Sequence, residues 1–560
     1  MVALTSLAGT MRLSSGVTWS LFGIAMCAME DFWVTDIPGA QNIDLPQMYA
    51  GNIPIPHHGS DSMMFFWLFE SKFRVTRPKT LIWFNGGPGC SSMDGSLLEL
   101  GPIRFNGQDN LVYNEGNWGE YLNLLFVDQP FGTGFSFSSP SELLDNVEQA
   151  AMFVDKFLQR WLQEFPQHQH DDFYIGGESY AGQYIPYLYK NLTAIDPKGL
   201  ILCNPWIDAG HQYLSYAQLI KDNSLIDPKY YDKLDQLHNN CMQSLQNSQI
   251  IGSYNAACDK ITSFALEKSK DSDHCFNYFD FKLEDTFPSC GMNWPPGVGD
   301  LSTYLNSDAV MSALHVNQSA SNRWVECSSA VNNAFKNLGV ASASTLLPDM
   351  LNEIPVLIMV GDSDYICNYA GLDGMISSLH WGSPESRSRG WNEDEMLENI
   401  SWQGEIVGTS RSGRNLTFAR IFDGSHMIPV DKQFETRAVI HQFTGLTKSY
   451  DEVPHITIPV ASKPVEPPST QLDQARYDAY KRAGLTALIV VIIIISLGLF
   501  WLFKKGDVHV SWHSITSGFA RALLHVGQPK IRQSFEYINL NTFRASRRPS
   551  TIIEEEEEEV

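Results

Sequence analysis

The chain has 560 residues, of which 43% are hydrophobic and 12% aromatic, so it is long enough to bury a large core. Its formal net charge is -24, and the glutamate run at 554–559 adds to this acidity as a solvated terminus. Binding to nucleic-acid phosphates requires clustered Lys and Arg, so this charge argues against nucleic acid as a partner.

Two apolar segments, one near each end, predict a protein that is anchored in a membrane. Residues 16–28, GVTWSLFGIAMCA, are too short to span a bilayer, so we interpret residues 1–28 as a signal peptide, with Met1 and Met11 both open as the start. Residues 485–503 carry no charge, match the ~20 residues of a spanning helix and lack the polar face of an ordinary core helix. Basic residues flank this segment on both sides. The signal peptide therefore sets the orientation, which is single-pass type I with a luminal body and a cytosolic tail at 504–560.

The cysteines and glycosylation sequons agree with a luminal body. There are nine cysteines, and Cys27 falls within the signal peptide. Cys203 and Cys367 lie in or beside apolar runs and are expected to be free thiols. The other six can form three disulfides in fifteen pairings: Cys90, Cys241, Cys258, Cys275, Cys290 and Cys327. Four N-glycosylation sequons begin at Asn191, Asn317, Asn399 and Asn415.

Short apolar runs predict a series of buried strands, which lie at 65–69, 80–84, 122–127, 173–175, 200–203, 355–360 and 416–422. Residues 142–165 have apolar side chains at helical spacing, and this helix is expected to end at Pro166. Strands that alternate with helices in this way predict an α/β fold with a mostly parallel central sheet.

The region between the fifth and sixth predicted strands lacks strong strand signals. It contains most of the cysteines, so we expect a disulfide-pinned cap insertion at about 209–330 within a domain spanning 29–450. Residues 451–484 are polar and Pro-rich, which predicts a luminal spacer that leads to the membrane helix.

The stretch GGESYAGQYIP, 176–186, has the layout of a nucleophile elbow, a sharp strand-to-helix turn that exposes a serine. Small neighbours, Gly177 and Ala181, let the backbone fold tightly around Ser179. The usual pattern has glycine at the second of these positions, and a Gly-Ser turn without catalytic use is the alternative.

A base and its orienting acid should follow the serine along the chain. Asp362 and Asp364 come directly after one predicted strand, and His426 follows another. Active sites in open α/β sheets gather at this edge, so His426 is expected to accept the proton of Ser179 while one aspartate orients it. The other aspartate is expected to serve a turn. The glycine-rich loop at 83–102 lacks the Lys-Ser/Thr of a phosphate loop and is expected to form an oxyanion hole.

Five motifs together resemble the serine carboxypeptidases: NGGPGCSS, VDQPFGTGFS, GESYAG, GDSDYICN and GSHMIP. The similarity covers roughly 32–450, and it implies an α/β-hydrolase fold with a cap insertion. With the signal peptide, the single span and CSSMDG, the chain resembles most the fungal pheromone-processing branch of the late Golgi.

The resemblance implies a role for individual residues. Ser179, Asp364 and His426 would form the catalytic triad, which leaves Asp362 structural, and the N–H groups of Gly87 and Tyr180 would form the oxyanion hole. The substrate-binding residues implied are Trp83, Asn85, Glu99, Glu178, Asp94, Cys367 and Met427. Cys90 and Cys327 would form a disulfide, and we expect Cys241 to pair with Cys258 and Cys275 with Cys290.

Glu99 and Glu178 resemble the family's carboxyl pair. Two adjacent carboxyls resist ionising together, so one keeps a proton and can donate a hydrogen bond to a substrate carboxylate at mildly acid pH. Asp94 falls where the resemblance puts the pocket for the released residue, and an acid there would pair with Lys or Arg. The alternative is that Asp94 complements the dipole of a helix that starts near Ser92.

We therefore expect a membrane-anchored luminal serine carboxypeptidase of the late Golgi that removes C-terminal Lys and Arg from processed precursors such as pheromones or toxins. No metal or organic cofactor is implied. The motif YINL, Tyr537 to Leu540, fits a sorting signal for adaptors. Two alternatives remain, an acyltransferase on the same scaffold and a silent receptor that binds C-termini.

Overall fold

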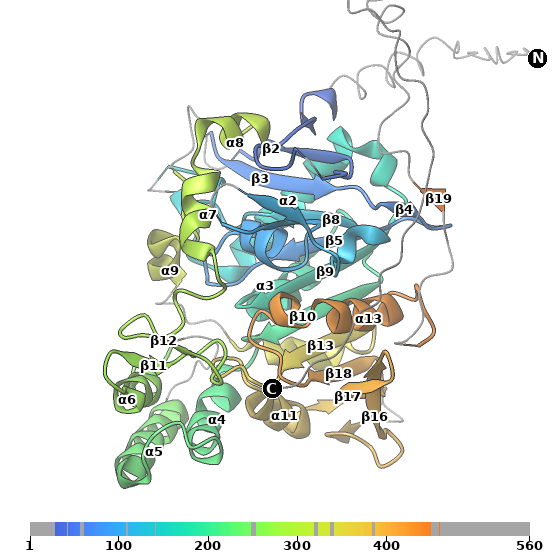
Figure 1. Ribbon diagram of the computed structural model, residues 1–560. Helices are drawn as coiled ribbons and strands as arrows, with labels where there is room; N and C mark the ends of the chain where they lie inside the picture. The colour runs from blue at the N-terminus through green and yellow to red at the C-terminus, as the bar shows by residue number, and fades with distance from the viewer. Residues whose placement is uncertain are drawn as a thin grey trace, which may run out of the picture. The chain divides into compact units, whose positions relative to one another are not determined.

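The computed structural model describes residues 29–449, apart from gaps at 42, 57–60, 108–109, 140–141, 248–253, 318–322, 336–340 and 384–386, and also residues 458–459 (Figure 1). The chain divides into Met1–Val465 and Glu466–Val560, and the fold below belongs to the first unit. The predicted signal peptide, membrane helix and cytosolic tail lie outside the described residues. Within those residues, every helix is too short or too polar to cross a bilayer.

An eleven-stranded sheet forms the centre of the unit (Figure 1). In spatial order its strands are β1 (Trp33–Val34), β2 (Met48–Pro54), β3 (Met63–Phe69), β8 (Asn123–Val127), β5 (Lys79–Phe84), β9 (Asp172–Ser179), β10 (Gly199–Pro205), β13 (Val356–Gly361), β18 (Leu416–Ile421), β17 (Glu405–Gly413) and β16 (Leu397–Trp402). The strands from β8 to β18 run parallel, and the flanking strands pair antiparallel. All seven predicted strands are confirmed as members of this sheet.

Both faces of the sheet are covered, because successive residues of each central strand enter different apolar clusters. In β3, Phe66 and Leu68 join one cluster, while Phe65 and Trp67 join the other. The first cluster includes the apolar side of α2 (Val147–Glu164) and α3 (Ala181–Asn191). The second includes η1 (Gly95–Glu99), α7 (Val298–Leu305), α8 (Asp308–Ala313) and α13 (Gln433–Phe443). This double burial explains why the central strands are continuous apolar runs in the sequence.

The predicted helix at 142–165 begins later than expected. Asn146 is its N-cap, and the Asn146 side chain accepts a hydrogen bond from the N–H of Gln149, so α2 starts at Val147. The prediction followed the apolar spacing of 142–146 and missed the capping residue.

The insertion between β10 and β13 adds no strand to the main sheet among its described residues (Figure 1, lower and far left). It contains α4 (Ala209–Asp222), α5 (Tyr231–Asn247), α6 (Asp259–Ser269), β11 (His274–Phe276), β12 (Glu284–Thr286), α7, α8 and α9 (Ser329–Phe335). The helices α4, α5 and α6 share an apolar cluster of their own.

All three expected disulfides are present, Cys90–Cys327, Cys241–Cys258 and Cys275–Cys290. Cys203 and Cys367 are free and buried, as predicted. The pair Cys241–Cys258 joins α5 to the start of α6, and Cys275–Cys290 closes the loop that carries β11 and β12. The insertion is therefore pinned at several points.

The shorter elements lie around this frame. They are β4 (Phe73–Arg74), β6 (Ile103–Phe105), β7 (Leu111–Tyr113), η2 (Trp118–Glu120), η4 (Pro166–His168), η5 (Pro228–Tyr230), η6 (Ala343–Leu346), α10 (Leu347–Met350), α11 (Tyr369–Ser378), β14 (His380–Trp381), β15 (Ser388–Arg389), α12 (Ile428–Asp431) and β19 (Ile458–Pro459).

The four sequons differ in their surroundings. Asn399 is exposed on the edge strand β16. Asn191 and Asn415 donate their side-chain amides to the carbonyls of Tyr187 and Leu351. The sequon of Asn317 extends into residues that the structure does not describe.

Candidate active site

The predicted chemical groups meet at the carboxyl ends of the parallel strands. Ser179 is the last residue of β9, Asp364 lies in the loop after β13, and His426 lies in the loop after β18. Asn204 lies near the end of β10, the strand between β9 and β13, and contacts Asp364. The sheet topology thus brings together residues from distant parts of the sequence.

The turn at Ser179 has the geometry that its small neighbours predict. Ser179 has φ 56°, in the left-handed region, which only a tightly constrained turn imposes on a serine. A Cβ on Gly177 would lie 2.4 Å from the Phe84 carbonyl oxygen, and a Cβ on Gly182 would lie 2.7 Å from the Cβ of Pro205. Ala181 packs its Cβ over Gly177, so alanine is accommodated at the position where glycine is usual.

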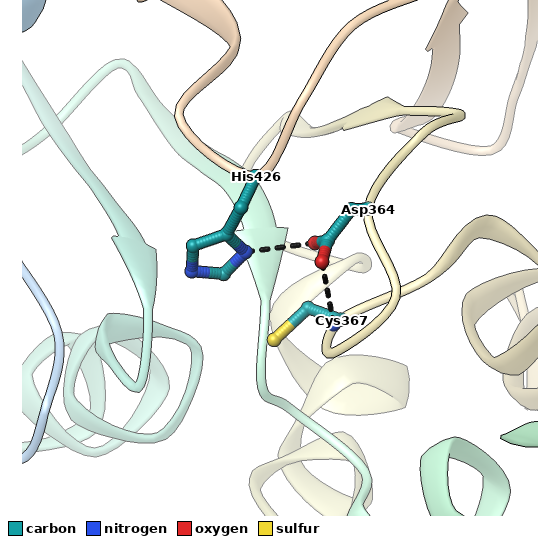
Figure 2. Close-up of side chains that lie close together, drawn as sticks. All are labelled: Asp364, Cys367 and His426. Carbon is teal, nitrogen blue, oxygen red and sulfur yellow. Dashed lines mark hydrogen bonds and ion pairs between the residues drawn. The ribbon is translucent and has the colours of Figure 1, made fainter. Parts of the chain in front are cut away.

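His426 and Asp364 form a buried hydrogen-bonded pair, with 2.7 Å between His426 Nδ1 and Asp364 Oδ2 (Figure 2). The same Asp364 oxygen accepts a hydrogen bond from Asn204 Nδ2 at 2.6 Å. The other oxygen accepts from the backbone N–H groups of Ile366 and Cys367. Asp364 is therefore fixed by four donors, and Nε2 of His426 lies on the side of the ring away from it (Figure 2).

Asp362, the other aspartate of the predicted pair, points elsewhere. Its carboxylate accepts from Arg420 Nη2 at 3.0 Å and from the N–H of Asp423 at 2.8 Å. It thus shapes the loop that leads to His426, as expected for a structural aspartate.

A residue of the insertion, Phe279, holds the other side of the histidine. The rings of Phe279 and His426 stack with centroids 5.0 Å apart, and the backbone N–H of His426 donates to the backbone carbonyl of Phe279 at 2.8 Å. Sequence reasoning missed both Phe279 and Asn204, because neither lies in a motif whose spacing indicates chemistry.

The side chains of Asp364, Cys367 and His426 also resemble a metal-ligand set, since their candidate ligand atoms lie within 4.8 Å of one another. However, Asp364 already bonds to His426, and burial together with the charges of Asp364 and Glu178 raises the pKa of the Cys367 thiol well above its usual value. The arrangement is better described as an acid–base pair beside a neutral thiol.

The glycine-rich loop after β5 packs tightly against the serine turn. A Cβ on Gly86 would lie 2.6 Å from both the Ser179 Cβ and the Tyr180 backbone nitrogen, and Gly87 has φ +107°. The disulfide Cys90–Cys327 fixes the end of this loop to the insertion. The loop backbone can therefore lie beside Tyr180 at the N-terminus of α3, where N–H groups can stabilise negative charge.

A carboxyl pair lies next to the serine. Asn85 Nδ2 donates to Glu178 Oε1 at 2.8 Å and to Glu99 Oε1 at 3.0 Å. Trp83 is fully buried and donates from Nε1 to Asn85 Oδ1 at 2.9 Å, so its connection to the site passes through Asn85. The second oxygen of Glu99 and of Glu178 is buried and accepts no N–H or hydroxyl donor among the described residues, so a hydrogen bond between the two carboxyls is the remaining contact within the pair.

The two carboxyls differ in their ease of ionisation. Burial raises the pKa of Glu178 well above its usual value, and the neighbouring charge of Glu99 raises it further. Burial also raises the pKa of Glu99, but hydrogen bonds from Glu178 and Asn85 and the electrostatic effects of His426 and Arg104 oppose this rise. Glu178 is thus the member that holds the proton, with Glu99 as its acceptor.

Two lobes of a cleft meet at Ser179. One, of about 490 Å³, is lined by Glu178, Asp94, Glu326 and Met427. The other, of about 360 Å³, contains Cys367 and a group of aromatic side chains with one acid, namely Trp206, Tyr213, Tyr216, Tyr254 and Asp259.

Asp94 is buried in the first lobe. It precedes η1 but makes no capping hydrogen bond, and its Oδ1 has no partner among the described residues. Burial, followed by the charge of Glu326, raises the pKa of Asp94 well above its usual value. The missing bond excludes a side-chain cap, and the raised pKa opposes the alternative in which a charged Asp94 complements the helix dipole. Glu326 was missed in the sequence, although the expected bond between Cys90 and Cys327 could have placed it beside the oxyanion loop.

Comparisons with known proteins agree with this geometry. The family profile described as serine carboxypeptidase (Peptidase S10) matches residues 38–445. The pheromone-processing carboxypeptidase KEX1 of Yarrowia lipolytica is 36% identical over 88% of this chain and 89% of its own, and that of Uncinocarpus reesii is 35% identical over 87% and 81%. The crystal structure of KEX1(delta)p, a prohormone-processing carboxypeptidase from Saccharomyces cerevisiae, matches with a TM-score of 0.69 at 31% identity, covering 74% of this chain and 96% of that one. With an α/β-hydrolase-like sheet and a family match over most of the described residues, the chain belongs to the serine carboxypeptidase family.

Proposed function

We propose that Ser179, His426 and Asp364 carry out the peptidase reaction. His426 Nε2 takes the proton of Ser179 as the hydroxyl oxygen attacks the last peptide carbonyl, and Asp364 stabilises the imidazolium that results. The N–H groups of Gly87 and Tyr180 hold the oxyanion. His426 then protonates the departing amine, and water releases the acyl group from Ser179 by the same steps in reverse.

The carboxyl pair accounts for cleavage at the end of a chain. In the free site the single proton of Glu178 is donated to Glu99, and Asn85 donates to both carboxyls. When a substrate binds, this proton and the Asn85 amide can turn to the C-terminal carboxylate of the substrate. Because Glu178 directly precedes Ser179, this carboxylate site leaves room for a single residue beyond the scissile bond. The observation that supports exopeptidase specificity best is this adjacency, together with the buried hydrogen bonds of the pair.

The released residue would be Lys or Arg. Asp94 and Glu326 lie in the same lobe as Glu178, so two acids face the space that the last side chain would occupy. A cation there would pair with one of them and relieve their mutual repulsion. Met427 would supply an apolar wall for the methylene groups of that side chain, and Cys367 would lie on the acyl side.

The proposed setting is the late secretory pathway. A cleaved signal peptide and a spanning helix at 485–503 would make the protein a single-pass type I membrane protein of the late Golgi, with YINL as a signal for sorting adaptors. Its substrates would be precursors such as pheromones or toxins that end in basic residues after endoproteolysis. The names of the similar fungal enzymes, pheromone-processing carboxypeptidases, support pheromone precursors as substrates.

The test is to incubate the luminal protein with peptides that differ only in a C-terminal Lys, Arg, Leu or Asp. We expect release of the terminal residue, fastest for Lys and Arg, and no release by Ser179→Ala. Transfer of the acyl group to an added alcohol in place of water would favour the acyltransferase. Tight binding of C-termini without turnover by the wild type would favour the receptor.

A further inference from the structure

Arg104 lies behind the carboxyl pair and does not contact the cleft. It sits in the middle of β6, and its Nη2 donates to the carbonyl oxygens of Glu99 at 3.0 Å and Pro429 at 3.1 Å. Its Nε is buried without a hydrogen-bond partner among the described residues. Arg104 is half-buried, and because its Nε has neither solvent nor a partner, its charge is partly desolvated and its position calls for a function that this charge can serve.

The two carbonyls belong to the two halves of the site. Glu99 ends η1 and carries one carboxyl of the pair, while Pro429 lies in α12, three residues after His426. Asn114 also donates to the Glu99 carbonyl, at 2.9 Å, but its other acceptor is Gly101 rather than the histidine loop. Arg104 therefore bridges the carboxyl pair to the histidine loop directly.

The surroundings of this bridge are acidic. Glu178, Asp94 and Glu326 line the adjoining lobe, and both Glu99 and Asp431 interact electrostatically with Arg104. A substrate carboxylate that enters this lobe would add a further negative charge next to the pair. One positive charge behind Glu99 offsets part of this repulsion, since it acts through a poorly solvated interior.

We propose that Arg104 is a positioning residue. It fixes the backbone of Glu99 relative to the loop that carries His426, and it supplies the positive charge needed to bind a substrate carboxylate. This rests on the proposed reading of the carboxylate by Glu178 and Glu99. A purely structural clamp would make a different prediction, because loss of a clamp would weaken all ligands alike, whatever their charge.

The experiment measures binding without turnover, in the Ser179→Ala background. The ligands are one peptide with a free C-terminus and the same peptide with a C-terminal amide, which lacks the negative charge. For Arg104→Gln we expect roughly tenfold weaker binding of the free acid, the size of one lost charge-assisted interaction, with little change for the amide. Arg104→Lys should stay close to the wild type.

Two further variants test whether the effect comes from the charge of Arg104 rather than from misfolding. Arg104→His is charged at pH 5 and neutral near pH 8, so one folded protein should show a normal ratio of acid to amide affinity at pH 5 and a reduced ratio, relative to wild type, at pH 8. Arg437→Gln is a matched control, because Arg437 also donates to a backbone carbonyl, that of Glu115, but lies outside the site. The control should leave the ratio unchanged.

The outcomes separate this inference from the function it rests on. In the carboxyl-pair hypothesis, the peptide with a free C-terminus binds more weakly at pH 7 than at pH 5 because Glu178 loses its proton. Glu178→Gln keeps a neutral donor and should abolish this weakening. If the weakening persists, Glu178 and Glu99 do not bind the substrate carboxylate as proposed. Suppose that Glu178→Gln behaves as expected, but that Arg104→Gln and Arg104→His weaken binding of the free-acid and amide peptides equally, or of neither. The proposed role of Arg104 is then wrong, while the function of the carboxyl pair stands.

Discussion

Asp94 and Glu326 provide the sharpest test of substrate choice. Asp94→Asn and Glu326→Gln keep the shape of each side chain and remove its charge. A hydrogen bond from a cation to a buried carboxylate is worth about 1.5–3 kcal/mol, which corresponds to roughly 10- to 150-fold in kcat/KM. Asp94 is 2% exposed, and its Oδ1 has no partner among the described residues. The free energy of pairing between a substrate cation and this site should therefore lie in this range rather than near the smaller value of a solvent-exposed ion pair.

The two acids should not act additively. Because they face the same space, one cation can still pair with the acid that remains after a single substitution. We expect each single variant to lose about three- to fivefold of the preference for Lys over Leu, and the double variant to lose about 100-fold, well above the product of the single losses. Turnover of the Leu peptide should stay within about twofold, since the charges do not contact an apolar side chain.

The assay is kcat/KM for two peptides that differ only in a C-terminal Lys or Leu. Asp259→Asn is the matched control, because Asp259 lies in the other lobe, beyond Ser179, and should leave the choice of released residue intact. Equal losses on Lys and Leu in the double variant would refute the reasoning, and so would a preference for Lys that persists without either acid.

Two further outcomes follow from contacts at the site, and a third from a buried histidine elsewhere in the fold. Asn204→Leu removes the side-chain donor to Asp364 and should lower kcat by about tenfold with KM nearly unchanged, as measured by steady-state kinetics. Phe279→Ala removes the ring stacked on His426 and should also lower kcat rather than raise KM; an effect confined to KM would contradict this. Burial alone would lower the pKa of His168, but Glu70 and Asp171 outweigh it and raise that pKa to about 9 from 6.5. The stabilisation, on the order of 3 kcal/mol, is complete below pH 6.5 and is lost as the pH rises to 9, so denaturant unfolding of His168→Gln should show a smaller decline over this window.

The sequence predicted the centre of the sheet better than its edges, for a physical reason. Strands β3, β5, β8, β10 and β13 are buried on both faces and appear as nearly continuous apolar runs. The outer strands β16 and β17 mix exposed and buried residues and carry no such signal. Their pairing depends on neighbours that only the folded chain supplies.

The site shows the same division between local and distant information. Ser179, Asp364 and His426, which lie at or just after strand ends, could be found because these strand ends meet at one edge of the sheet. Phe279 and Arg104 could not be found, because their contacts with His426 and Glu99 depend on how the insertion and β6 pack against the loops.

The same lobe must accept a carboxylate and a cation, and these demands have opposite pH dependence. Glu178 donates to a substrate carboxylate only while protonated, so carboxylate binding weakens as the pH rises through its raised pKa. Asp94 and Glu326 attract Lys only when ionised, so that attraction weakens as the pH falls through their raised pKa values. Peptides ending in Leu should therefore bind better toward acid pH, whereas peptides ending in Lys should have an optimum at higher pH. The ratio of Lys to Leu cleavage should rise between pH 5 and pH 7, and a constant ratio would mean that the charge on Asp94 and Glu326 does not select the substrate.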